Sequence, residues 1–315
     1  MNSQLYKSKK MLYRTFILSF INPVLLLLMF SAKIFGQQQP KLYIGMAGLN
    51  DLQETYIRQN NLEKAVIFYQ KEVTTDGINV NPSLFRKNIE RKTSSKSQGI
   101  AIIDWEGPAF KALSGSNTKQ ASQFIEEFIK TLELAKRLRP NLQWGFYGLP
   151  LRTFDGSNGN WKQINTRLTP IIKESDIITP SLYMYNVNSR VYNINYPQIE
   201  RGRGDYLYLN LDYALDLAQK FNKKVYPFIW HKQNSGNNKM ALSLIPVDIF
   251  KNYYKMITTH TSNGKKVNGV IWWDNSNYYY LNRNRYPAVQ KQYQNIRNVR
   301  QYDLDVLKKY HQATK

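Results

Sequence analysis

The sequence has no cysteine and only three histidines, His231, His260 and His311, in 315 residues. The lack of cysteine excludes a disulfide framework, a thiol nucleophile and a cysteine-ligated metal site. So few histidines also disfavour a multi-histidine metal centre, and we expect neither a metal nor another cofactor. No glycine-rich phosphate loop follows any apolar run, which argues against an open nucleotide-binding sheet.

Acidic residues are scarce as well: Asp and Glu number 22 against 44 Lys and Arg, which gives a net charge of +22. A strongly basic protein attracts polyanions, among which acidic polysaccharides and nucleic acids are the usual partners. No nucleic-acid-binding motif is present, so we expect an acidic polysaccharide and no nucleic acid. A basic surface that only aids solubility is the plainer alternative, and composition alone leaves it open.

Long hydrophobic runs are absent except near the N-terminus. Residues 1–36 combine a basic start with a mostly apolar stretch at residues 16–30. This stretch is short for a membrane span of about 20 residues, and Asn22-Pro23 interrupts it. We therefore interpret residues 1–36 as a secretory signal peptide and residues 37–315 as a single barrel domain. The protein is then secreted, periplasmic or extracellular, with no membrane span after cleavage; an uncleaved anchor is the alternative.

Strand-like and helix-like runs alternate along the rest of the chain. The predicted strands cover residues 41–46, 65–69, 99–106, 144–149, 177–185, 225–230 and 267–272. The predicted helices are one that begins at Asn81-Pro82 and others at residues 124–139, 161–173, 211–221, 247–259 and 293–310. Repeated units of this size predict a parallel sheet with helices outside it. Residues that could take part in catalysis recur at strand ends, which favours an α/β barrel of the (β/α)8 TIM type. The barrel could be irregular or have fewer strands.

Two carboxylates end the most apolar of these strands, Ile100-Ala101-Ile102-Ile103-Asp104-Trp105-Glu106. Successive side chains of a strand point to opposite faces, so Asp104 and Glu106 share one face and Trp105 takes the other. Gly107-Pro108 then stops the strand. In α/β barrels the carboxyl end of a strand is where active sites lie. The plainer interpretation is a solvated face, because Asp-x-Glu spacing is common.

A pair of acids in this position suits glycoside hydrolysis, which needs a proton donor and a group that stabilises the transition state. Repulsion between the two carboxylates raises the proton affinity of one of them. Glu106 is longer and nearer the strand end, so it is the better acid/base candidate. Asp104 would then orient a substrate group. This arrangement fits substrate-assisted cleavage, in which the N-acetyl oxygen of the sugar is the internal nucleophile.

The run from Gly99 to Glu106 closely resembles the catalytic strand of the hyaluronidase glycoside hydrolases of animals and venoms. Further segments resemble strands of this family in the same order along the chain, at residues 67–69, 139–150, 180–184 and 270–276. The resemblance spans roughly residues 65–276 and is concentrated in patches at strand ends.

The resemblance implies a role for each matching residue. Glu106 would be the acid/base, and Asp104 would hold and polarise the substrate acetamide. Tyr183 would hydrogen-bond that acetamide or the reacting ring, Trp272 would form a wall of the pocket, and Tyr147 would line the cleft. The structural alternative for Tyr183 and Trp272 is packing in the barrel core.

The chain also departs from the family pattern. The family has a second tyrosine in the strand where this chain has Phe228, which removes one hydrogen bond to the acetamide. Tyr226 and Trp230 share a face with Phe228 in a regular strand, so either could compensate. The disulfides of the family are absent.

We therefore expect a secreted glycoside hydrolase that cuts next to an N-acetylhexosamine in a polysaccharide, by substrate-assisted retention of configuration. Hyaluronan or chondroitin is the favoured substrate, from the resemblance and the basic charge. One alternative is a muramidase-like peptidoglycan hydrolase, since such barrels also carry an Asp-x-Glu strand end. The other is an inactive polysaccharide-binding barrel, which Phe228 favours.

Overall fold

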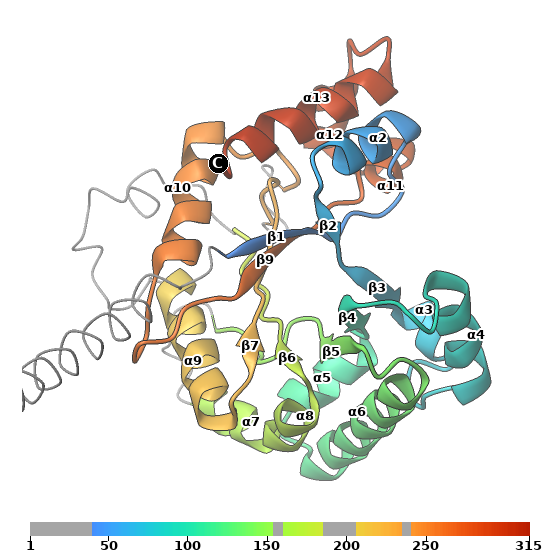
Figure 1. The fold of residues 1–315 in the computed structure, drawn as a ribbon, viewed down its shortest axis with the longest axis vertical. Coiled ribbons are helices and arrows are strands. Elements are labelled where there is room, and N and C mark those ends of the chain that lie inside the picture. Colours follow the sequence, from blue (N-terminus) through green and yellow to red (C-terminus); the bar gives the residue numbers. More distant parts are fainter. Residues whose placement is uncertain (1–39, 154–159, 185–205, 235–240) are drawn as a thin grey trace, which may run out of the picture. The chain divides into compact units, whose positions relative to one another are not determined.

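A computed structural model describes residues 40–153, 160–184, 206–234 and 241–315, and shows parallel strands surrounded by helices (Figure 1). The predicted α/β class is therefore confirmed. The strands are β1 (Lys41–Ile44), β2 (Glu63–Lys64), β3 (Val66–Tyr69), β4 (Gly99–Asp104), β5 (Leu142–Phe146), β6 (Ile177–Ile178), β7 (Lys224–Val225), β8 (Phe228–Ile229) and β9 (Gly269–Trp272). The interpretation of residues 1–36 as a signal peptide lies outside the described residues.

The helices alternate with the strands as the sequence pattern predicts. The first of them are α2 (Asp51–Gln59), α3 (Gln70–Val73), α4 (Pro82–Lys92), α5 (Pro108–Ser114), α6 (Thr118–Leu138), α7 (Trp161–Arg167) and α8 (Thr169–Glu174). The later ones are α9 (Tyr206–Phe221), α10 (Val247–Thr259), α11 (Ser276–Leu281), the 3-10 helix η1 (Arg283–Arg285), α12 (Pro287–Tyr293) and α13 (Val299–Gln312). Over the described ranges, no helix has the length and apolar character needed to cross a membrane.

The strands follow one another around an irregular ring. The assigned ladders are all parallel and form three sheets, β2-β1-β9-β8, β3-β4-β5 and β6-β7, so they do not make one closed sheet. Backbone hydrogen bonds join these sheets: Gly148 N donates to Thr179 O at 2.9 Å, and Phe228 N donates to Pro180 O at 2.8 Å. Only Ala65 separates β2 from β3. The ring accords with the predicted irregular barrel.

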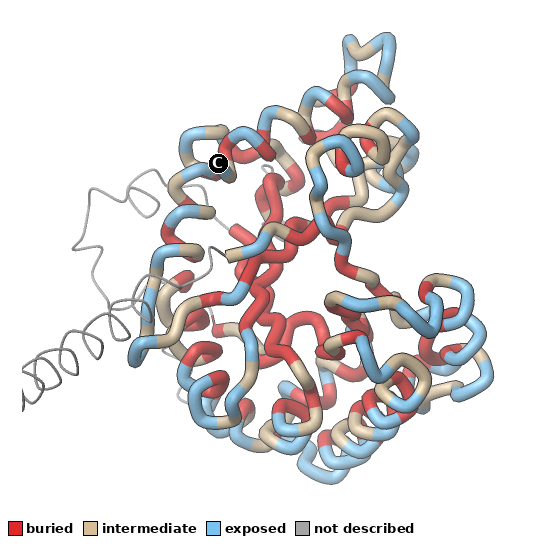
Figure 2. The backbone as a smooth tube through the Cα atoms, viewed as in Figure 1, coloured by how far each residue is buried: buried red, intermediate tan, exposed pale blue. Residues whose placement is uncertain are grey.

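Side chains alternate between two cores along these strands. In β4, Ile100 and Ile102 face an inner core, whereas Ala101 and Ile103 face an outer core beneath the helices. This is the period-2 alternation of a strand buried on both faces. Figure 2 shows the central strands buried and the outer surfaces of the helices exposed. The alternation decides which residues reach the centre of the ring.

Two helix ends show how local sequence sets these boundaries. As predicted, Asn81 caps α4: its Oδ1 accepts from Leu84 N at 3.0 Å, and Pro82 occupies the first turn. The predicted terminal helix at 293–310 is instead divided, because α12 ends at Tyr293 and α13 begins at Val299. Asn298 caps the new start by accepting from Gln301 N at 3.1 Å. The apolar spacing continues across the break, so periodicity alone misses it.

Candidate functional site

The two carboxylates at the end of β4 are positioned by the tryptophan between them. Trp105 is fully buried, its Nε1 donates to Gly77 O at 3.1 Å, and its ring stacks on Phe128 with centroids 5.2 Å apart. This anchor holds Trp105 in the outer core, so Asp104 and Glu106 lie on the opposite side of the chain. β4 ends at Asp104, and Glu106 lies in the turn before α5. Gly107 takes a φ of 58° there, a left-handed conformation that suits glycine.

Asp104 is held in an environment that favours its neutral form. Its Oδ1 is buried and has no hydrogen-bond partner among the described residues. Burial, and secondly the charge of Glu106, raise the pKa of Asp104 from 3.8 to about 8. Both effects penalise the charged carboxylate. An unpartnered buried oxygen is costly, which makes Asp104 a candidate for binding a ligand that donates a hydrogen bond.

Glu106 differs from Asp104 in exposure and in its neighbours. By surface area Glu106 is exposed, yet protein atoms crowd its carboxylate enough for desolvation to raise its pKa, and the Arg152 cation opposes this rise. Both acids line an open pocket of about 450 Å³ together with residues of β3, α3 and the turn that follows them. The pocket gives the carboxylates access to a ligand.

Two predicted tyrosines lie beside the acids. Tyr183 and Tyr147 are nearly buried, with ring centroids 6.0 Å apart. Burial raises the pKa of both phenols above 10, and the charges of Asp104 and Glu106 add to this rise, which places the four residues in one electrostatic neighbourhood. Each tyrosine therefore stays a neutral hydroxyl.

Arg152 joins this neighbourhood through a serine. Its Nη1 donates to Ser181 Oγ at 2.8 Å, and the same Oγ lies 3.1 Å from Tyr147 Oη. Arg152 lies after the end of β5, and Glu106 lies after the end of β4. Because β4 and β5 are neighbours in one sheet, both residues lie at the same edge of it. The sequence pattern did not single out Arg152. Its only signal was a position shortly after a strand end.

Phe228 occupies the inner core at the position expected from the resemblance. It is 1% exposed, and its ring meets Tyr147 edge-on at 4.9 Å. Tyr226 and Trp230 share this core with Phe228, as the strand alternation predicted. The Trp230 ring lies 5.5 Å from that of Tyr183, whereas Tyr226 meets Tyr43 at 5.6 Å. Trp230 is therefore the neighbour of Phe228 that lies nearer Tyr183, but its only side-chain donor is already bonded to Asp274.

The structure does not bring Trp272 to the pocket. Trp272 is fully buried in the outer core, where its ring lies 5.9 Å from Phe250 of α10. The adjacent residue takes the inner position: Trp273 stacks on Tyr183 with centroids 5.9 Å apart and meets Trp230 at 4.9 Å. Trp273, rather than Trp272, therefore takes the inner position beside Tyr183. The signal was available, because Ile271 faces inward and Trp273 shares its face.

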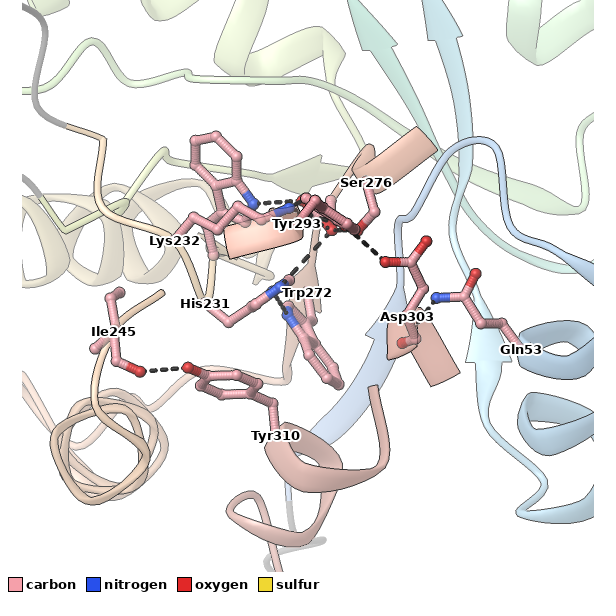
Figure 3. Close-up of polar contacts among 11 residues, drawn as sticks. Gln53, His231, Lys232, Ile245, Trp272, Ser276, Tyr293, Asp303 and Tyr310 are labelled. Carbon is pink, nitrogen blue, oxygen red and sulfur yellow. Dashed lines mark hydrogen bonds and ion pairs between the residues drawn. The ribbon is translucent and has the colours of Figure 1, made fainter. Parts of the chain in front are cut away.

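A buried ion pair lies beside the aromatic cluster that Tyr183, Trp230 and Trp273 form. Lys232 Nζ lies 2.8 and 2.9 Å from the two carboxylate oxygens of Asp274 (Figure 3), and both side chains are almost fully buried. Trp230 Nε1 also donates to Asp274 Oδ1, at 2.8 Å, and the Ser276 hydroxyl donates to Oδ2. The charge of Lys232 helps to hold the pKa of Asp274 well below its usual range despite burial. Asp274 thus fixes the orientation of Trp230.

His231 extends this network. It is 2% exposed, and burial lowers its pKa to about 3. Trp272 Nε1 donates to His231 Nδ1 at 3.0 Å (Figure 3), so the neutral ring carries its proton on Nε2. That nitrogen faces Asp274 Oδ2 at 3.7 Å. Within the described ranges, no group of three or more His, Asp or Glu side chains is placed to hold a metal ion.

Comparison with known proteins identifies relatives of one kind. The chain is 26% identical to inactive hyaluronidase B of Vespula vulgaris over 205 residues, which cover 60% of this chain and 55% of that one. It is 26% identical to a hyaluronidase of Polybia paulista over 208 residues, covering 61% and 65%. The chain thus matches about half to two thirds of the length of these relatives. No family model matches.

Comparison with solved structures also finds hyaluronidases. Bee venom hyaluronidase matches with a TM-score of 0.53 at 16% identity, covering 80% of this chain and 100% of that one. Its complex with a hyaluronic acid tetramer matches with a TM-score of 0.54 at 17% identity, covering 80% and 98%. At such low identity these structures establish the fold alone. The resemblance inferred from the strand-end motifs is confirmed: the chain is hyaluronidase-like.

Proposed function

We propose that the protein is a glycoside hydrolase that cuts next to an N-acetylhexosamine in a polysaccharide, with hyaluronan or chondroitin as favoured substrate. The observation that carries this proposal is the pair Asp104 and Glu106, both with raised pKa and both lining one open pocket. The relatives named hyaluronidase support the class of reaction, and the basic composition supports an anionic substrate.

Glu106 is the proposed acid/base. Desolvation raises its pKa, the direction that suits a proton donor, and its exposure lets it reach the glycosidic oxygen. The acetamide oxygen of the substrate attacks C1 while the C1–O bond breaks, and the leaving oxygen takes the proton of Glu106. Water then attacks C1 of the cyclic intermediate, its proton returns to Glu106, and the configuration is retained.

Asp104 is the proposed partner of the acetamide. Its buried, unpartnered Oδ1 is an acceptor that the acetamide N–H would satisfy. The nitrogen gains positive charge as the acetamide oxygen attacks, so an ionised Asp104 stabilises the transition state more than the ground state. Binding of the substrate therefore favours release of the proton that burial holds on Asp104 in the free protein. Tyr183 and Trp273 would orient the sugar ring against this pair.

The test is a reducing-end assay on hyaluronan, chondroitin and peptidoglycan, with wild type and two variants. Glu106→Gln removes the proton donor and should lower turnover by about 10²–10⁴-fold. Glu133→Gln, an exposed glutamate on α6, is the matched control and should retain wild-type turnover. Near-wild-type turnover in Glu106→Gln would contradict the assignment. Release of reducing ends from peptidoglycan alone would identify a muramidase instead.

Phe228 and the relative named inactive favour one other candidate, a barrel that binds the polysaccharide without cutting it. A hydroxyl missing at Phe228 would weaken the hold on the acetamide and lower turnover. Binding of hyaluronan with no new reducing ends after long incubation would support this candidate.

We also propose that residues 1–36 direct secretion, because a basic start precedes their apolar stretch. N-terminal sequencing of protein recovered from the medium tests this, and retention of residues 1–36 would refute cleavage.

A further inference from the structure

The segment at residues 275–302 has an unusual composition. It contains five basic residues and six tyrosines and no acid. It forms α11, η1, α12 and the start of α13, next to α2 (Figure 1). Arg300 is paired with Asp51, but Arg283, Arg285 and Lys291 make no ion pair with any residue that the structure describes. We call residues 276–293 the α11–α12 cap.

The cap has its own pocket, separate from that of the carboxylates. This open cavity of about 670 Å³ lies between α11, η1 and α12 and is lined by Tyr280, Arg283 and Lys291 among others. The Arg283 guanidinium lies over the Tyr280 ring at 4.5 Å and donates to the Tyr280 carbonyl oxygen at 3.0 Å. Tyr280 also meets Tyr293 at 5.0 Å. The cation is therefore held in place against aromatic surface.

A series of aromatic rings connects the cap to the candidate site. Trp273 stacks on Tyr183 beside the acids and meets Trp230, whose ring lies 5.7 Å from Tyr279 of α11. Tyr279 in turn meets Tyr286 at 5.6 Å. α11 thus places Tyr279 toward the site and Tyr280 toward the cap pocket.

We propose that the α11–α12 cap binds the continuation of an anionic polysaccharide beyond the bond that is cut. Aromatic rings offer flat apolar faces to sugars, and unpaired cations attract the carboxylates that recur along such a chain. The surface lacks acids, so nothing on this segment repels a polyanion. The proposal rests on the proposed function for the identity of the polymer, but binding can be measured whether or not cleavage occurs.

The experiment measures binding of fluorescently labelled hyaluronan by anisotropy, in the Glu106→Gln background so that the probe stays intact. The variant Arg283→Gln/Arg285→Gln/Lys291→Gln removes three charges, of which Arg285 and Lys291 are exposed and Arg283 is half-buried. Each exposed charge contact contributes about twofold to threefold in affinity, so together they should raise the Kd of long hyaluronan roughly tenfold at low salt. Raising the salt should shrink this difference, because exposed charges are screened. Because the cap is proposed to bind only the continuation of the polymer, the Kd of a hyaluronan tetrasaccharide should change less than twofold.

The matched control removes three exposed charges on the other side of the ring. Arg86 and Lys87 of α4 and Lys119 of α6 are exposed and make no ion pair within the described ranges. Their combined Gln variant should bind long hyaluronan like the parent. Equal weakening by the two triple variants would overturn the proposal, since it would show attraction by net charge alone. Equal weakening for short and long hyaluronan would also overturn it.

Two further probes test the chemistry of the ligand. A neutral N-acetylglucosamine oligomer should bind the cap variant and the parent alike. A single-stranded oligodeoxynucleotide should bind more weakly than hyaluronan, and tighter binding of the oligonucleotide would overturn the assignment to a polysaccharide.

Discussion

The buried pair of Lys232 and Asp274 gives the sharpest prediction about stability. Their side chains are 1% and 3% exposed, and each carboxylate oxygen of Asp274 lies within 2.9 Å of the ammonium group. Asp274→Asn leaves Lys232 buried without a counter-charge, which costs about 3–5 kcal/mol in comparable pairs. A domain of this kind is stable by only about 5–15 kcal/mol, so the free energy of unfolding should fall by about a fifth or more.

Lys232→Met should cost a similar amount, because it leaves the Asp274 carboxylate without its cation. The double variant Lys232→Met/Asp274→Asn contains no uncompensated charge and should recover at least half of the combined loss. Urea unfolding followed by tryptophan fluorescence measures these differences, since Trp230 donates directly to Asp274. Lys41→Met is the control: its partner Glu63 is 48% exposed, and the change should cost less than about 1 kcal/mol.

Two results would refute this reasoning. One is an Asp274→Asn variant within about 1 kcal/mol of wild type. The other is a double variant as unstable as the sum of its singles, because additivity would mean that the two charges do not stabilise each other.

Three other changes have distinct expected outcomes. The pKa of Asp104 is about 8 in the folded protein and 3.8 in the unfolded chain, so protonation of Asp104 stabilises the folded state. This contribution is full below pH 3.8 and is lost as the pH rises to about 8. Thermal melts from pH 4 to 8 should show the loss in wild type and not in Asp104→Asn. Trp273→Ala should raise the KM for hyaluronan severalfold, whereas Trp272→Phe should lower the melting temperature and spare KM; the reverse pattern would restore Trp272 to the pocket. Gly145→Ala would place a Cβ 2.6 Å from Ile177 O and should cost about 1–3 kcal/mol in urea unfolding, and a neutral effect would contradict the close contact of β5 and β6.

The sequence predicted the strands and the alternation of their faces, because both follow from local patterns. The run from Ile100 to Glu106 is long enough to show that it is buried on both faces, and the structure has Trp105 on the side opposite Asp104. The same rule, applied to β9, places Trp273 rather than Trp272 at the centre. The family motif alone pointed to Trp272, whereas the alternation from Ile271 points to Trp273 as the inward-facing residue.

Contacts between distant segments could not be predicted in this way. His231 follows a strand end, and α13 covers it: the His231 ring lies 4.8 Å from that of Tyr310. The pairing of Lys232 with Asp274 joins residues that are 42 positions apart, and neither carries a local signal of burial. Such contacts depend on how helices pack over the strands, and single-sequence periodicity does not encode that.

The same limit governs the protonation of the two acids. Their spacing predicted that repulsion would raise the pKa of one carboxylate, and side-chain length favoured Glu106. In the structure burial is the larger cause, and it acts most strongly on Asp104, which ends the strand inside the ring. Glu106 lies two residues further along, in the turn before α5, where Arg152 opposes the rise of its pKa. Under the proposed function, the acetamide of the substrate favours the ionised form of Asp104. We therefore expect selectivity for N-acetylhexosamines to depend on the burial of Asp104 as well as on the shape of the pocket.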